Sequence, residues 1–211
     1  MRSMEALTGI GLSASAGLNA YIPLLILGLL NRFTNLITLP RGWEWLSNGW
    51  MLALLGVLLA VEVVADKVPA LDSVNDVVQT GIRPTAGGLA FGASSQSSTV
   101  TVTDPGTFFH GHQWLAVVSG AVIALILHTM KAGARPVINV ATFGVGAPVV
   151  STIEDGASIG MSLIAIVLPI LVIVALAMVV LGLWRLRVRL KRRRHARTVA
   201  AQATSPPSAG P

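Results

Sequence analysis

Apolar residues fill long stretches of the chain, and charged residues interrupt them at only a few places. A helix needs about 20 mostly apolar residues to cross the roughly 30 Å of hydrocarbon in a bilayer. Four stretches meet or approach this length and are predicted to span a membrane: residues 7–30, 50–65, 114–130 and 163–184. Trp50 and Trp114 begin two of them, as expected of tryptophans at the membrane interface. Pro169 is expected to kink the last.

Two further segments, residues 77–93 and 136–150, are short and rich in glycine. We leave open whether they cross the membrane, form broken helices or re-enter, because irregular backbone at membrane depth is tolerated only when protein buries it or it lines a cavity. With them, the sequence predicts an all-α polytopic membrane protein of about six membrane segments. Residues 1–184 form its single transmembrane domain.

The composition supports a membrane protein and excludes several other classes. The chain has 211 residues, of which 53% are hydrophobic and 11% are charged, whereas soluble domains carry about 25% charged residues. A soluble enzyme and a disordered chain are therefore disfavoured. The absence of cysteine excludes a disulfide scaffold and fits a bacterial membrane protein.

The net charge of +6 belongs to one end of the chain. Eight of the 15 Lys and Arg residues lie between Arg185 and Arg197. The rest of the chain has seven basic residues and nine acidic ones, so it is slightly acidic. The positive-inside rule then predicts a multi-pass protein of the inner (plasma) membrane with a cytoplasmic C-terminus. Six crossings also place Arg2, Lys67, Lys131 and Arg135 inside, with Arg32 and Arg41 outside. We expect segment 185–197 to contact anionic lipid head groups rather than nucleic acid, and residues 198–211 to be a disordered tail.

The only two Arg-Pro dipeptides in the chain suggest an internal repeat. Arg83-Pro84 and Arg135-Pro136 are 52 residues apart, and five of twelve positions around them are identical. With six crossings both copies run in the same direction, as a parallel repeat requires. Proline after arginine suits a helix start, and a helix N-terminus beside an arginine attracts anions.

Four carboxylates within 15 residues are candidates for ion chemistry: Glu62, Asp66, Asp72 and Asp76. Glu62 and Asp66 are four residues apart and share a helix face. The four could bind a divalent cation or carry protons. Alternatively, Asp66 pairs locally with Lys67 while the later two lie on a solvated connector.

Two other polar positions have open interpretations. Glu154 and Asp155 are either counter-charges to Arg135 or Lys131, or an acidic pair favoured at a helix N-terminus. Asn19 lies within an apolar stretch, where it could cap a broken helix, contact a substrate or make an interhelical hydrogen bond. A metal site at His110 and His112 is a weak alternative to a surface loop, and the metal remains unassigned. The common nucleotide-binding and hydrolase motifs are absent from the sequence.

The chain resembles an uncharacterised bacterial integral-membrane family that is known as a domain of unknown function of the four-thousands series. Four stretches carry the resemblance: SASAGLNAYIP at 13–23, EVVADKVPALD at 62–72 with Asp76, QTGIRPTAG at 79–87, and KAGARP at 131–136 with Asn139 and PVVSTIED at 148–155. Many members have a Ser-Pro-Glu-Pro-like element after the asparagine, where this chain has Thr142 to Pro148, so a carboxylate role does not carry over there. The resemblance implies a membrane protein and supplies no activity.

Three functions remain open on this evidence. The first is a small transporter or channel-like protein for an anion or a lipid, with substrate bound by Asn19, Arg83, Arg135 and Asn139. Ions or protons would be coupled by Glu62, Asp66, Asp72, Asp76, Glu154 and Asp155. The second is a membrane enzyme that acts on a lipid phosphate with a carboxylate-bound metal, and the third is a membrane scaffold. We favour the first, expect no cofactor and leave a homo-oligomer open.

Overall fold

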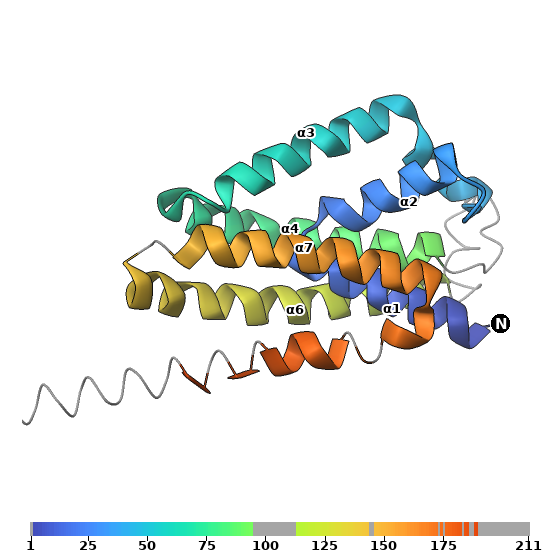
Figure 1. Cartoon of the computed structure of the whole chain (residues 1–211). Helices are drawn as coiled ribbons and strands as arrows, with labels where there is room; N and C mark the ends of the chain where they lie inside the picture. The colour runs from blue at the N-terminus through green and yellow to red at the C-terminus, as the bar shows by residue number, and fades with distance from the viewer. Residues whose placement is uncertain are drawn as a thin grey trace, which may run out of the picture.

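The computed structural model describes residues 2–94, 113–143 and 146–172, together with 174, 176–182, 184, 185, 188 and 189. Its described secondary structure is entirely helical (Figure 1), which confirms the predicted all-α class. The helices are α1 (Arg2–Leu18), α2 (Tyr21–Phe33), η1 (Arg41–Ser47), α3 (Gly49–Ala65), α4 (Pro69–Ser94), α6 (Gln113–Thr142), α7 (Gly146–Val167) and η2 (Pro169–Leu171). The His110/His112 segment, most of the basic segment 185–197 and the tail 198–211 lie outside the described residues.

Residues 7–30, predicted as one span, instead form two antiparallel helices that we call the N-terminal hairpin. α1 ends at Leu18 and α2 begins at Tyr21, and Figure 1 shows α2 running back toward the end of the bundle where the chain starts. Met4 near the start of α1 and Leu27 in α2 line the same cavity. The prediction of a single span is therefore wrong, because a hairpin buried in protein is as apolar as a span.

The tip of the N-terminal hairpin lies inside the bundle. The carbonyl oxygen of Leu18, the last residue of α1, accepts a hydrogen bond from Lys131 in α6. α6 continues for another 11 residues, to Thr142, which is about 16 Å of helix. The hairpin therefore ends well short of the far end of its neighbour.

The chain after residue 113 divides differently from the sequence prediction. α6 continues through Pro136 to Thr142, so the predicted segment 136–150 is the end of α6, a turn and the start of α7. Phe143 has a φ of 53°, the left-handed conformation that commonly ends a helix. The predicted span 163–184 is interrupted at Leu168, because a residue that precedes proline is disfavoured in the α conformation and Leu168 has a φ of −136°.

α4 and α6 lie antiparallel at glycine-rich contacts. A Cβ atom on Gly88 would lie 2.8 Å from the carbonyl oxygen of Val117, and one on Gly92 would lie 3.2 Å from a Val117 methyl group. Nearer the start of α4, Thr80 bonds to His128, so positions rise along one helix as they fall along the other. Small residues thus let the two backbones approach closely, as in other membrane bundles.

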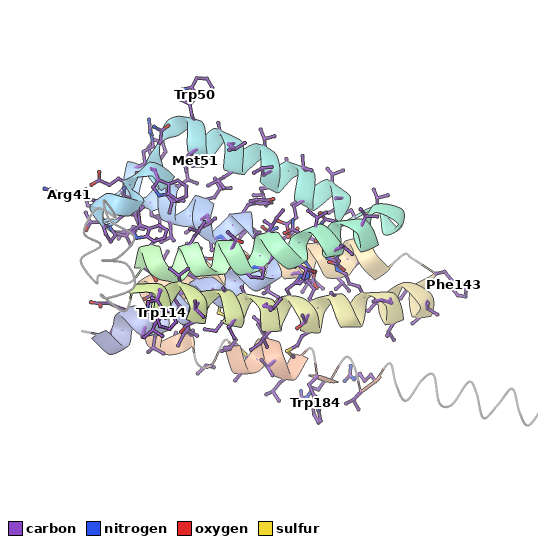
Figure 2. The ribbon with its side chains drawn as sticks, turned by 180° about the vertical axis from the view of Figure 1, so that it is seen from behind. Arg41, Trp50, Met51, Trp114, Phe143 and Trp184 are labelled. Carbon is purple, nitrogen blue, oxygen red and sulfur yellow. The ribbon has the colours of Figure 1, made fainter. Side chains whose placement is uncertain are left out.

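Among the described residues, two helices are long and apolar enough to cross a membrane: Trp114–Thr142 and Pro148–Val167. A third candidate is η1 with α3, a pair bent by 60°. These are fewer than the six predicted segments, although α3 matches predicted residues 50–65 closely. Trp50 at its start is 87% exposed and points away from the bundle in Figure 2, where Phe143 lies at the opposite end from Arg41 and Trp114.

Candidate functional site

The break between α1 and α2 leaves backbone groups that side chains satisfy. The Asn19 carboxamide oxygen accepts hydrogen bonds from the backbone N–H groups of Tyr21 (3.1 Å) and Ile22 (3.2 Å). At the other side of the break, Arg83 Nη1 donates to the Gly17 carbonyl oxygen at 3.2 Å, and Lys131 Nζ donates to that of Leu18 at 2.9 Å. Cations are favourable at a helix C-terminus, so α1 ends on two positive charges.

Asp66 lies at the centre of these charges. It directly follows α3, and its carboxylate accepts hydrogen bonds from Arg135 at 2.7 and 3.3 Å and from Lys131 at 3.2 Å. Arg83 Nη2 lies 3.7 Å from the same carboxylate, and Asn75 donates to it at 2.6 Å. Asp66 is thus buried among three cations, and the alternative of a local pair with its neighbour Lys67 is not what the structure shows.

Three further carboxylates, Glu62, Asp76 and Glu154, complete what we call the ion-pair network: Glu62, Asp66, Asp76, Arg83, Lys131, Arg135 and Glu154. Glu62 Oε1 accepts from Arg83 Nη2 at 2.7 Å, and both side chains are fully buried. Glu154 Oε2 lies 2.9 Å from Lys131 Nζ and 3.1 Å from Arg135 Nη2. Glu154 is therefore a counter-charge to both cations.

A second ion pair lies at the edge of the network. Asp155 accepts a hydrogen bond from the Asn19 carboxamide at 3.0 Å and lies 3.8 Å from Lys67, which is partly exposed. Asn19 therefore caps α2 with its oxygen and contacts α7 with its nitrogen. Of the three alternatives for Asn19, the structure shows both the cap and the interhelical hydrogen bond, and substrate contact stays a prediction.

The two arginines converge because their helices are antiparallel. Side chains on a helix lean toward its N-terminus, so Arg83 on α4 and Arg135 on α6 lean toward each other. Although the two arginines start at different levels along the bundle, each lies within 3.7 Å of the Asp66 carboxylate. This arrangement corrects the repeat prediction: the two copies run in opposite directions, and Pro84 and Pro136 lie inside helices rather than at their starts.

The serines of α1 hold the hairpin against α7 and α4. The Ser15 hydroxyl is 2.7 Å from the hydroxyls of Ser158 and Ser162, and Ser13 donates to the Gly87 carbonyl oxygen at 2.9 Å. All of these contacts are buried. Interhelical hydrogen bonds of this kind contribute about 0.6 kcal/mol each in membranes, so this face fixes the hairpin beside the network.

Burial and nearby cations set the pKa values of Asp66 and Asp76, the two carboxylates of the network that lie outside the candidate spans. Although burial alone would raise it, the cations Lys131 and Arg135 hold the pKa of Asp66 at about 2. Burial raises the pKa of Asp76 to about 6. Lys131 and Arg83 act in the opposite direction but do not reverse the effect of burial on the pKa of Asp76.

The family comparison agrees with the resemblance seen in the sequence. A family model described as Domain of unknown function (DUF4126) matches residues 6–189. The chain belongs to this family. No curated protein and no solved structure matches it. Every member of the ion-pair network lies within the part of this DUF4126 chain that the family model covers.

The structure brings together most of the site residues predicted for this DUF4126 protein. They are Asn19, Glu62, Asp66, Asp76, Arg83, Arg135, Glu154 and Asp155. Asp72 lies in α4 and Asn139 in α6, and their side chains lie outside the described ones. The prediction missed Lys131 as a site residue, although its spacing of four from Arg135 places both on one helix face.

The described part of the DUF4126 chain offers no set of side chains that would bind a metal ion. There, no group of three or more His, Cys, Asp or Glu side chains is placed to hold a metal ion. Each network carboxylate instead lies beside a cation, at 2.7 to 3.6 Å. These side chains are arranged as ion pairs.

Proposed function

We propose that this protein is a small membrane transporter or channel-like protein for an anion or a lipid, coupled to protons. The observation that carries the proposal is the position of the ion-pair network at the buried tip of the N-terminal hairpin, where the helix is broken. Ionisable groups at membrane depth are costly and mark ion or substrate pathways. Transporters commonly place discontinuous helices at the substrate site.

The pairing suggests how substrate and protons would be coupled. Arg83 and Arg135 are held by Glu62, Asp66 and Glu154, so the network does not present a free positive charge. Protonation of a carboxylate would weaken its attraction to the arginine. A phosphate or carboxylate group of the substrate could then replace it as the bidentate partner that arginine favours.

We further propose how the protein sits in the inner membrane. α3, residues 77–93 of α4, α6 and α7 cross it side by side, with the buried Arg83 of α4 turned inward, and the N-terminal hairpin re-enters from one face. The apolar residues after Pro169 return across the membrane, so the basic segment 185–197 lies in the cytoplasm against anionic lipid. This arrangement puts the N-terminus on the face opposite the tail.

Reconstitution into liposomes tests the function. The first arm follows proton entry with an enclosed pH dye when inorganic phosphate or chloride is supplied outside, and the second follows movement of fluorescent phosphatidylglycerol between leaflets. We expect anion- or lipid-dependent flux in the wild type, at least tenfold less in Glu62→Gln and Arg135→Gln, and unchanged flux in the exposed control Glu44→Gln. Wild-type vesicles no more active than empty ones in either arm would overturn the proposal.

A further inference from the structure

The described charges of the ion-pair network do not balance. Four carboxylates, Glu62, Asp66, Asp76 and Glu154, face three cations. An uncompensated charge in a dry interior is strongly unfavourable, and a carboxyl group there takes up a proton instead. One carboxyl group of the four should therefore be neutral when the network is at rest.

The contacts identify which carboxyl group has the weakest hold on a cation. Asp66 lies within 3.7 Å of three cations, Glu154 lies within 3.1 Å of two, and Glu62 is 2.7 Å from one. Among the described residues, the nearest cation to Asp76 is Arg135, at 3.6 Å. Within the same part of the chain Asp76 Oδ1, like Glu62 Oε2, is buried without a hydrogen-bond partner, but Glu62 keeps its close pair with Arg83. Protonating Asp76 therefore loses less attraction to nearby cations than protonating any other carboxylate of the network.

Asp76 is also the carboxylate best placed to exchange a proton with water. Its side chain is 13% exposed, against 9% for Glu154 and 0–1% for Glu62 and Asp66. It lies in the second turn of α4, near the turn that joins α3 to α4. A proton can thus reach the network at Asp76 without crossing the other pairs.

We propose that Asp76 is the proton-binding site of the ion-pair network, neutral at rest and ionised when its O–H bond breaks and the proton passes to water. The assignment deepens the proposed transport function and, as a coupling device, rests on it. Ionised Asp76 adds a negative charge beside Arg135 and competes with the other carboxylates that pair with it. Loss of the proton would thus weaken the hold of Arg135 on Asp66 and Glu154.

Charged or titratable groups from α4, α6, α7 and the residue after α3 surround Asp76. The charged or titratable groups facing it are Arg83 on its own helix, Lys131, Arg135 and His128 on α6, Asp66 after α3, and Glu154 on α7. α1 carries no titratable side chain after Glu5, which is near its far end. Burial raises the pKa of Asp76 to about 6 in this setting, within the range where a proton site responds to physiological pH.

Carbon-13 NMR of the full chain in lipid nanodiscs, labelled on aspartate side-chain carboxyls, tests the assignment directly. We expect one aspartate to titrate with a midpoint near pH 6, to vanish in Asp76→Asn, and to remain in the control Glu44→Gln. Asp76→Glu, labelled on glutamate, should restore a titration above that of exposed glutamates, which separates loss of the site from misfolding.

Two results would overturn the assignment: an Asp76 that stays ionised from pH 8 down to pH 4.5, or one whose signal follows added sodium at fixed pH instead of protons. The titration needs no transport, so its outcome is separable from that of the flux assay. An Asp76 that titrates in a protein without flux would overturn the proposed function and leave the proton site standing. Flux without such a titration would do the reverse.

Discussion

Removing Arg83 should expose the energetics of the buried network most clearly. Its Nη2 atom lies 2.7 Å from Glu62 Oε1, and neither side chain reaches solvent. Arg83→Gln would leave a buried carboxylate without its nearest cation, and breaking a buried pair in this way costs about 3–5 kcal/mol. Protonation can neutralise the Glu62 carboxylate. From an ordinary pKa of about 4.3, taking up that proton at pH 7 costs roughly 3.7 kcal/mol at 1.36 kcal/mol per pH unit.

The same reasoning predicts how the loss of stability depends on pH and which second substitution should offset it. At pH 5 the proton costs only about 1 kcal/mol, so the loss of unfolding free energy relative to the wild type should shrink by about 2–3 kcal/mol between pH 7 and pH 5. Glu62→Gln combined with Arg83→Gln removes both charges and should recover most of the loss at pH 7. Unfolding in mixed micelles, followed by tryptophan fluorescence, measures these differences.

Arg32→Gln is the matched control for the arginine. Arg32 is exposed and donates to a backbone carbonyl, that of Ser47 at 2.9 Å, so its loss should change stability by no more than about 0.5 kcal/mol. If Arg83→Gln costs the same at pH 5 and pH 7, or if the double variant loses as much as its two single variants together, the buried-pair account is wrong.

Three more predictions follow from other parts of the fold. Gly17→Ala should destabilise the protein by about 1–3 kcal/mol, because the new Cβ would lie 2.7 Å from a carbonyl oxygen of α6, whereas Gly81→Ala faces open space and should stabilise it by about 0.5–1 kcal/mol. Equal effects in chemical unfolding would contradict the close helix contact. The pKa of Asp66 falls from 3.8 to about 2 on folding, so it contributes about 2 kcal/mol above pH 4 that is lost as the pH falls toward 2. An acid unfolding curve that Asp66→Asn leaves unchanged would refute this. The chain has no native cysteine, so Met4→Cys and Leu36→Cys each introduce one reactive thiol. Because the hairpin returns to its starting side, both should react with an impermeant maleimide from the same side of the membrane. Labelling from opposite sides would show that residues 7–30 span it.

The sequence is most informative where a helix has clear ends. Residues 50–65 were predicted to form a helix, and α3 runs from Gly49 to Ala65. Asn48 accepts a hydrogen bond from the Trp50 backbone N–H, which is the usual way for a side chain to cap a helix start. The charged residues of the site were equally visible, because ionisable groups are rare in a chain this apolar.

Hydropathy could not reveal how the apolar segments are divided. Residues 7–30 have the length and polarity of a span, and only the arrangement of α1 and α2 in the structure (Figure 1) shows that they turn back. Prolines were equally ambiguous. Pro136 lies inside α6, whereas Pro169 follows a break in the helix. In membrane helices neighbouring groups can satisfy the backbone that a proline frees, so packing decides which proline interrupts a helix.

The buried tip of the N-terminal hairpin gives a physical reason for the whole ion-pair network. A helix that ends inside an apolar bundle leaves carbonyl groups without partners, and each unsatisfied group there costs several kcal/mol. Arg83 and Lys131 supply donors to the last carbonyls of α1, but they bring two buried charges that must themselves be compensated. Asp66 and Glu62 then follow as their counter-charges. Because Asp66 also pairs with Arg135, changing the protonation of the network should alter how firmly the hairpin tip is held.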